Sequence, residues 1–277
     1  MGLFVAEQTP IIRSFKNAPV IETVLSIQFA PISKLTIPYL GLYWDRVRAE
    51  FKRFELKPPI QHIVEDFGPG PRPAIPPIAF NLVTEPEIRC WFIEEKGNCF
   101  IQLQQDRFLY NWQRVQQNDV YPRYEKTRAT FLKEWQGFCS FLESENLGSP
   151  EVDQCEVTYV NHIPYDAGWN TYGELNKVVS YWSGRSSGNF LPDPNKVNMS
   201  IRYLMPDDKG RLYITLQPVI TRDAIEVLQL NLTARGAPTS SKTEDIFRWL
   251  DFGRQWVVEG FTDFTSKEMH KNWGREL

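Results

Sequence analysis

Alternation of apolar and polar side chains predicts most of the strands in this chain. A strand with one buried face shows this period of two, and β-branched and aromatic residues strengthen the signal. Turn residues such as Lys96-Gly97-Asn98 close the hairpins between neighbouring segments. The predicted strands are Val20 to Phe29, Ile88 to Glu95, Cys99 to Gln104 and Phe108 to Trp112, followed by Glu156 to Ile163, Lys196 to Leu204, Arg211 to Pro218 and Ala224 to Thr233.

Apolar residues that recur every three or four positions predict the helices. The first helix runs from Thr36 as far as Phe54, and the second starts near Pro122, with Asn118 or Asp119 as its cap. The capping-box pattern predicts two more helices, which begin at Thr171 to Glu174 and at Ser241 to Glu244, and the tail Phe261 to Leu277 adds a short one.

The order strand, helix, three strands, helix therefore occurs twice. Pro31 lies 133 residues before Pro164, and Ile101 lies 113 residues before Ile214. The difference between these offsets is close to the length of a proline-rich excursion at 57–77. This pattern predicts an α+β fold with an antiparallel sheet, helices on one face and an internal duplication. The expected organisation is a loosely held N-terminal arm at 1–19, a first repeat at 20–150, and a second repeat with its tail at 151–277.

A doubled unit of this kind resembles the saddle fold of the TATA-binding-protein type. A single large helix-grip sheet is the alternative. Either architecture describes a scaffold and carries no function by itself.

The excursion at 57–77 contains seven prolines and cannot occupy a sheet interior or a helix. It is a stiff surface loop or, alternatively, a segment or lid that docks a partner.

Composition limits the classes of function. Apolar residues make up 42% of the chain and aromatic residues 14%, which is enough for a large core. The net charge of -3 gives no indication of nucleic-acid binding. No apolar run is long enough to span a membrane and no signal peptide is visible, so the chain is expected to be cytoplasmic. The cysteines Cys90, Cys99, Cys139 and Cys155 are spaced like structural thiols, and neither a metal site nor a cofactor is indicated.

The strand faces opposite the apolar ones are rich in amides and hydroxyls. Amides both donate and accept hydrogen bonds, so such a face suits specific recognition, although a plain solvent-exposed face is the other interpretation. The residues assigned to it are Gln28, Gln102, Gln104, Asn111, Asn161, Thr215, Gln217, Gln229, Asn231 and Thr233.

Two arginines are candidates for binding an anion or carboxylate. Asp106 and Arg107 occupy a predicted hairpin corner, and Arg123 lies where the next helix starts. Guanidinium groups offer forked donors, which suit carboxylates. An exposed corner pair such as Asp106 and Arg107 is more usually a solvated turn, and the anion site is the alternative interpretation.

The run Gln102 to Trp112 and the element Tyr121 to Glu125 resemble motifs of a sporadically distributed family of uncharacterised bacterial proteins. The strand start Pro19-Val20-Ile21-Glu22 is a further mark of that family. The resemblance spans most of the chain and implies a bacterial source. Sporadic distribution would suit a role in genome defence, including antiviral defence.

Catalytic signatures are absent from the sequence pattern. His162 with Glu156 is the pair to watch for acid–base chemistry, although a histidine at a strand end more often bonds to neighbouring backbone. The G-x-S-x-G match at 184–188 follows a helix rather than a strand, which indicates a linker. The expected function is non-enzymatic recognition of a protein, peptide, nucleic acid or small ligand within a bacterial multi-component system, with a protein partner or a second copy of the chain favoured. The alternative is a metal-independent hydrolase or nuclease using Glu156, His162 and Arg107.

Overall fold

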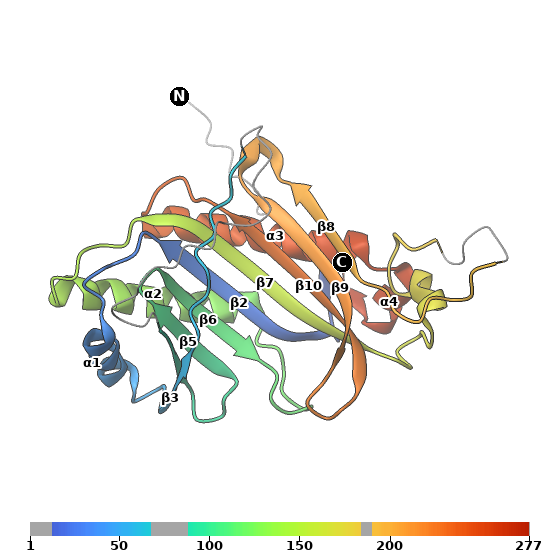
Figure 1. Ribbon diagram of the computed structural model, residues 1–277, viewed down its shortest axis with the longest axis horizontal. Helices are drawn as coiled ribbons and strands as arrows, with labels where there is room; N and C mark the ends of the chain where they lie inside the picture. The colour runs from blue at the N-terminus through green and yellow to red at the C-terminus, as the bar shows by residue number, and fades with distance from the viewer. Residues whose placement is uncertain (1–12, 68–87, 184–189, 277) are drawn as a thin grey trace.

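The computed structural model describes residues 13–67, 88–183 and 190–276. Within them, a nine-stranded antiparallel sheet has the order β3-β4-β5-β6-β2-β7-β10-β9-β8 (Figure 1). Its strands are β2 (Val20–Phe29), β3 (Arg53–Lys57), β4 (Arg89–Ile93), β5 (Cys99–Gln104), β6 (Arg107–Gln113), β7 (Val152–Pro164), β8 (Met199–Leu204), β9 (Arg211–Ile220) and β10 (Glu226–Gly236).

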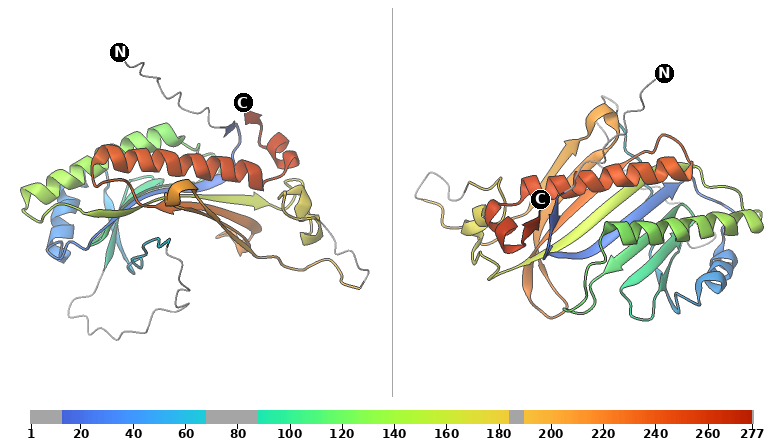
Figure 2. Two further views of the ribbon diagram at one scale, coloured as in Figure 1. Left: turned by 90° about the horizontal axis from the view of Figure 1, so that it is seen from above. Right: turned by 180° about the vertical axis from the view of Figure 1, so that it is seen from behind.

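Two long helices, α2 (Tyr124–Ser144) and α3 (Thr243–Phe264), lie side by side on one face of this sheet (Figure 2). Aromatic side chains fill the layer between them and the sheet. The ring of Phe108 on β6 stacks on Phe138 of α2 at 4.9 Å, and Phe131 of α2 contacts Phe247 of α3 at 5.6 Å. The smaller elements are α1 (Ile37–Val47), α4 (Lys267–Asn272), and the 3₁₀ helices η1 (Tyr172–Lys177) and η2 (Pro206–Asp208).

The opposite face of the sheet curves away from the helices and is called the concave face here (Figure 2). Strand alternation decides which side chains it carries. On β2, the buried residues Leu25, Ile27 and Phe29 join the core under the helices, so Gln28 faces the other way. The sequence prediction of an α+β fold with an antiparallel sheet and helices on one face is confirmed.

The two halves of the chain contribute strands in matching order. β2 and β7 are neighbours at the centre, with β6, β5 and β4 outward on one side and β10, β9 and β8 on the other. The offset of 113 keeps Ile101 and Ile214 both in the core. The offset of 133 does not hold, because it matches the core residue Leu25 with Thr158. Thr158 pairs with Val24 and therefore lies on the face opposite to Leu25. A shift of one residue inverts every side chain of a strand.

Several predicted elements differ from those observed. The first helix ends at Val47, and Arg53–Lys57 forms the edge strand β3 instead of a last helical turn. Phe51 is fully buried and its carbonyl accepts a hydrogen bond from the indole of Trp44 at 3.2 Å, which turns the chain out of the helix. The helix predicted after Thr171 is only the six-residue η1.

The predicted caps are also wrong. Neither Thr171 nor the N-terminus of α3 has a side-chain cap, and the Ser241 hydroxyl instead accepts from the amide of Val152 at 2.9 Å. Asp119 closes a turn by accepting from the amides of Val115 and Gln116.

The described part of the N-terminal arm is held to the other end of the chain. β1 (Ser14–Phe15) pairs with β11 (Arg275–Glu276) as a separate two-stranded sheet. Phe15 is buried against Phe261 and Trp273. The expectation of a loosely held arm is therefore wrong for these residues, and 1–12 lie outside the described chain. The short helix predicted in the tail is confirmed as α4.

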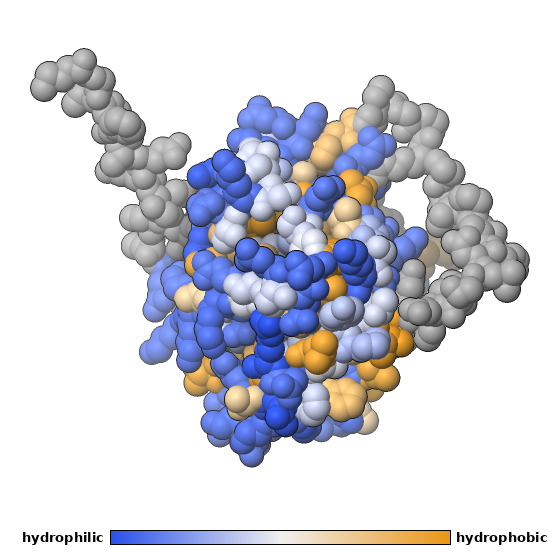
Figure 3. Space-filling view, turned by 90° about the vertical axis from the view of Figure 1, so that its left-hand side faces the viewer, coloured by the Kyte–Doolittle hydropathy of each residue, from blue (hydrophilic) through white to orange (hydrophobic). Residues whose placement is uncertain are grey.

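The end of the molecule formed by α1 and the last turns of α2 is mainly hydrophilic, with small hydrophobic patches among the polar residues (Figure 3). Across the described residues, none of the helices is long and apolar enough to cross a membrane.

Candidate functional site

Residues 58–67, which follow β3, cross the concave face from β5 to β9, and this segment is called the strap here. It is the first part of the proline-rich excursion, whose residues 68–77 lie outside the described chain. The polar face predicted from sequence is thus partly occupied by the protein's own backbone.

Two glutamines hold the strap by pairing with its peptide groups. The Gln104 side chain accepts from the amide of Ile60 and donates to the carbonyl of the same residue, both at 3.0 Å. Gln28 does the same with Ile63, accepting at 3.3 Å and donating at 2.8 Å. Each carboxamide satisfies the amide and the carbonyl of one residue, as a neighbouring strand would. This pairing recognises the peptide groups of the strap and does not depend on its side chains.

A third glutamine extends the row. Gln154 on β7 accepts from the amide of Glu65 at 2.8 Å and donates to the carbonyl of Ile63 at 2.5 Å. Gln154 was not among the residues predicted from sequence to bind. The signal was present, because Gln154 continues the alternation of Glu156 and Thr158 on β7.

Glu65 anchors the far end of the strap. Its carboxylate side chain is only 3% exposed, forms an ion pair with Arg211 and accepts from the Tyr213 hydroxyl at 2.5 Å. Arg235 lies 3.8 Å from the same carboxylate. The guanidinium of Arg211 also lies over the ring of Phe67 at 4.5 Å. The end of the strap is therefore fixed by charge as well as by hydrogen bonds.

His62, in the middle of the strap, lies between two carboxylates on the sheet. Its Nδ1 lies 2.7 Å from Asp106 and its Nε2 lies 3.0 Å from Asp153. This contact was not predicted from sequence, because Asp153 and His62 are far apart in the chain and meet only where the strap crosses the sheet.

Arg107 is buried, with 4% of the residue exposed, which overturns its predicted place at a solvated hairpin corner. Its guanidinium donates to the side-chain oxygen of Gln28 and to the carbonyl of Gln61 at 3.1 Å. Burial lowers the pKa of Arg107, partly offset by the nearby carboxylates. The strap covers this corner and is hydrogen-bonded to both Gln104 and Arg107.

Gln102 and Asn111 are buried in a hydrogen-bonded chain across four strands. Arg89 donates to Gln102 at 2.8 Å, Gln102 donates to Asn111 at 2.7 Å, and Asn111 donates to Glu22 at 2.7 Å. Burial raises the pKa of Glu22, although the bond from Asn111 acts against this. These amides are engaged with each other, which leaves them less able to bind a partner.

The second half of the concave face is more open. Gln217 is exposed, and Gln229, Asn231 and His162 are half-buried. Gln229 lies 3.2 Å from the Nε2 of His162, and burial lowers the pKa of that histidine. The side-chain oxygen of Asn231 is buried with no hydrogen-bond partner among the described residues. These four residues, together with the hydroxyl pair of Thr158 and Thr233 (2.9 Å), are called the strap-free end.

Glu156 and His162 do not form a catalytic pair. They are six residues apart on one face of β7, which corresponds to roughly 20 Å. Glu156 is instead bound to Arg235 at 2.7 Å. The described residues contain no group of three side chains that could hold a metal ion. Burial raises the pKa of the Cys90, Cys99 and Cys139 thiols to about 11, and that of Cys155 further. The G-x-S-x-G match at 184–188 lies outside the described chain.

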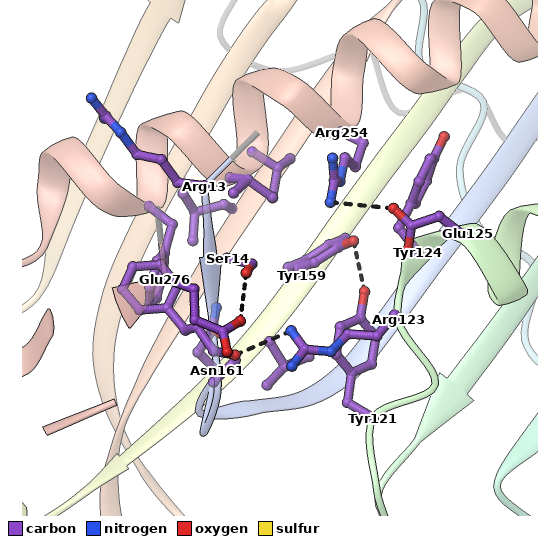
Figure 4. A pocket seen from close by; sticks show the side chains of 17 residues that line it. Arg13, Ser14, Tyr121, Arg123, Tyr124, Glu125, Tyr159, Asn161, Arg254 and Glu276 are labelled. Atoms are coloured by element: carbon purple, nitrogen blue, oxygen red, sulfur yellow. Dashed lines mark hydrogen bonds and ion pairs between the residues drawn. The ribbon is translucent and has the colours of Figure 1, made fainter. Parts of the chain in front are cut away.

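Asn161 and Arg123 lie on the helix side of the sheet, so Asn161 does not belong to the polar face as predicted. Asn161 shares the core-facing side of β7 with Tyr159 and donates to the carbonyl of Leu230 at 3.0 Å. Both residues line a pocket of about 550 Å³ between α3, the start of α2 and the paired ends of the chain (Figure 4). Arg123 and Arg107, predicted together as an anion site, are separated by the sheet.

No protein-family model, no curated protein and no solved structure gave a significant match to the chain.

Proposed function

We propose that the protein is a recognition module that binds an extended segment of a protein partner at the strap-free end of the concave face. The observation that carries this is the reciprocal pairing of Gln104 with Ile60 and of Gln28 with Ile63. The face already binds one extended main chain by this means. A peptide segment of a partner presents the same donors and acceptors.

The strap-free end has the chemistry for a second such segment. Gln217 follows Ile214 by three residues, as Gln104 follows Ile101, and both glutamines point to the concave face. Gln104 is occupied by the strap, whereas Gln217 is exposed. Gln229, opposite Gln217 across β9 and β10, and Asn231 supply further amide groups. Each pairing with a peptide group would contribute about 1 kcal/mol net.

The partner segment would lie across the strands, as the strap does. Such recognition depends on main-chain groups, so it suits an unfolded or extended protein segment better than DNA, for which the net charge of -3 offers no attraction. The resemblance to a sporadically distributed bacterial family favours a partner from the same multi-component system.

Peptide selection from a random library tests the proposal. We expect peptides that bind the wild type and lose at least tenfold in affinity on a Gln217→Ala, Gln229→Ala double variant. A Gln136→Ala variant on the exposed side of α2 is the matched control, because it removes one amide on the helix side. N-methylation of single peptide bonds should weaken binding more than alanine replacement of side chains. If no selected peptide depends on Gln217 or Gln229, the proposal is wrong.

We also infer that the two halves are copies of one unit. Supporting this are the matching strand order and the shared facing of Ile101 and Ile214. From Glu22 to Gln28, the correspondence between β2 and β7 must use an even offset rather than 133, because residues that share a face there differ by an even number. Superposing 20–143 on 154–260 should give such an offset; an odd one across the whole strand would contradict duplication. The saddle fold of the TATA-binding-protein type is likewise a proposal, and it depends on the same duplication.

The hydrolase or nuclease alternative has less support. The long separation of Glu156 from His162 and the ion pair of Glu156 with Arg235 mean that these two residues do not form the acid–base pair that this alternative requires.

A further inference from the structure

The pocket on the helix side combines converging cations with an apolar floor. Arg123 comes from the N-cap of α2 and Arg254 from the middle of α3. Figure 4 shows both near the hydroxyl groups of Tyr121 and Tyr159, whereas the side chain of Arg13 turns away. Arg13 is already paired with Glu259 at 2.9 Å. Arg123 donates one hydrogen bond to the backbone carbonyl of Phe15 at 3.1 Å. The guanidinium of Arg254 and the remaining donors of Arg123 line the pocket.

Arg254 has unused hydrogen-bonding capacity. Its Nε is buried with no hydrogen-bond partner in the described chain, and its guanidinium lies over the ring of Tyr124 at 5.2 Å. The nearest carboxylate recorded for it, that of Glu125, is 3.8 Å away on a side chain that is 76% exposed. A loose ion pair of this kind contributes little and yields readily to a better acceptor.

One hydroxyl hydrogen of the Tyr121 and Tyr159 pair is available to a ligand. The hydroxyl groups of Tyr121 and Tyr159 are 2.8 Å apart. Only one of the two hydrogens can lie between them, so the accepting hydroxyl keeps a hydrogen for another acceptor. Burial raises the pKa of both phenols, which keeps both hydrogens in place at neutral pH.

The backbone at Arg123 is also unusual. Its φ of 67° and ψ of 158° fall in a region that is rare for residues other than glycine. This conformation starts the 21-residue helix α2 at the pocket, and no side chain caps it. The partial positive charge of the helix start adds to that of the arginines.

The remaining walls are apolar. Val20, Leu232, Val257 and Phe261 line the pocket and would cover a hydrocarbon or aromatic body. The two carboxylates of the lining, Glu125 and Glu276, are exposed. They would repel a dianion more strongly than a monoanion.

We propose that this pocket binds a small carboxylate with an apolar body, its carboxylate held by Arg254, Arg123 and the tyrosine hydroxyl pair. The site is separate from the concave face, because the sheet lies between them. Its occupancy therefore does not depend on peptide recognition.

Three ligands that share one chain and differ in their head groups test the proposal: octanoate, octanol and octyl phosphate. Isothermal titration with the full chain should show saturable binding of octanoate, and at least tenfold weaker binding of octanol. Arg254→Ala should weaken octanoate binding at least tenfold and Tyr121→Phe several-fold. Arg248→Ala, on the same helix but exposed and outside this pocket, should leave it unchanged.

Circular dichroism and melting curves of each variant establish folding, and Tyr121→Phe keeps the test open if Arg254→Ala fails to fold. Absence of saturable octanoate binding to the wild type would overturn the proposal. Equal binding of octanol would remove the role of the arginines. Tighter binding of octyl phosphate than octanoate would overturn the carboxylate and assign a phosphate head group.

Discussion

Removing the carboxylate of Glu65 should release the strap at its far end. In a Glu65→Ala variant, Arg211 loses its carboxylate and the Tyr213 hydroxyl loses its acceptor, while Arg235 keeps Glu156. A hydrogen bond to a charged group contributes about 1.5–3 kcal/mol, and breaking a fully buried ion pair costs about 3–5 kcal/mol. Arg211 is 19% exposed, so water screens part of the loss. We therefore expect a local cost of about 2–4 kcal/mol.

Hydrogen exchange followed by mass spectrometry measures this cost where it occurs. A loss of about 2 kcal/mol corresponds to roughly thirty-fold faster exchange, since each 1.36 kcal/mol is a factor of ten. The strap peptide that contains the amides of Ile63 and Glu65 should show this, because both amides are bonded to glutamines. Peptides from α3 should change far less.

Glu55→Ala is the matched control. It removes the same charge from an exposed residue of β3, whose carboxylate contacts Lys57 at 2.6 Å. Exposed substitutions usually stay within about 0.5 kcal/mol. If strap exchange in Glu65→Ala equals that in Glu55→Ala, Glu65 does not hold the strap and the argument from its burial fails.

Three further outcomes follow from the same geometry. The double variant Gln104→Ala, Arg107→Ala should lose about 3–5 kcal/mol of unfolding free energy in urea, because both residues are buried and bonded to the strap; a loss below about 0.5 kcal/mol would place them back in solvent. Glu22→Gln should gain stability at pH 7 but not at pH 4. The pKa of Glu22 is raised in the folded state, so its stabilising contribution is present below the unfolded value of 4.5 and is lost as pH rises through the folded value; equal effects at both pH values would contradict this. Thiol titration at pH 8 should find Cys90 and Cys155 unreactive until the chain unfolds, since both are buried and burial raises their pKa values.

The strands and their faces could be predicted from sequence because alternation is a local property. The strands Val20–Phe29 and Cys99–Gln104 have the predicted bounds. Asn161 was the exception: its polarity suggested the concave face, but its position on β7 places it with Tyr159 on the helix side. Position along the strand was the better guide, because the period of two does not depend on residue type.

The candidate site could not be predicted in the same way. The roles of Gln104, Gln28 and Gln154 depend on where residues 58–67 run. That path is fixed by contacts between residues far apart in the chain, such as Tyr213 with Glu65, which are 148 positions apart. Seven prolines indicated a stiff excursion but gave no direction. The buried charge of Glu65 gave no local signal, because its partners lie on β9 and β10.

The strap also explains why one end of the concave face is occupied and the other is open. Residues 58–67 leave the edge strand β3, which has no counterpart beyond β8 in the described chain. The second half therefore has matching strands but no equivalent edge strand from which a strap could start. Gln217 lies on β9 where Gln104 lies on β5, and within the described residues it is exposed, with no main chain bound to it. If the halves are related by a twofold axis between β2 and β7, a partner segment over Gln217 and His162 would run antiparallel to the strap at the opposite end of the sheet. The extra strand in the first half and the proposed partner site in the second are then two consequences of the same asymmetry.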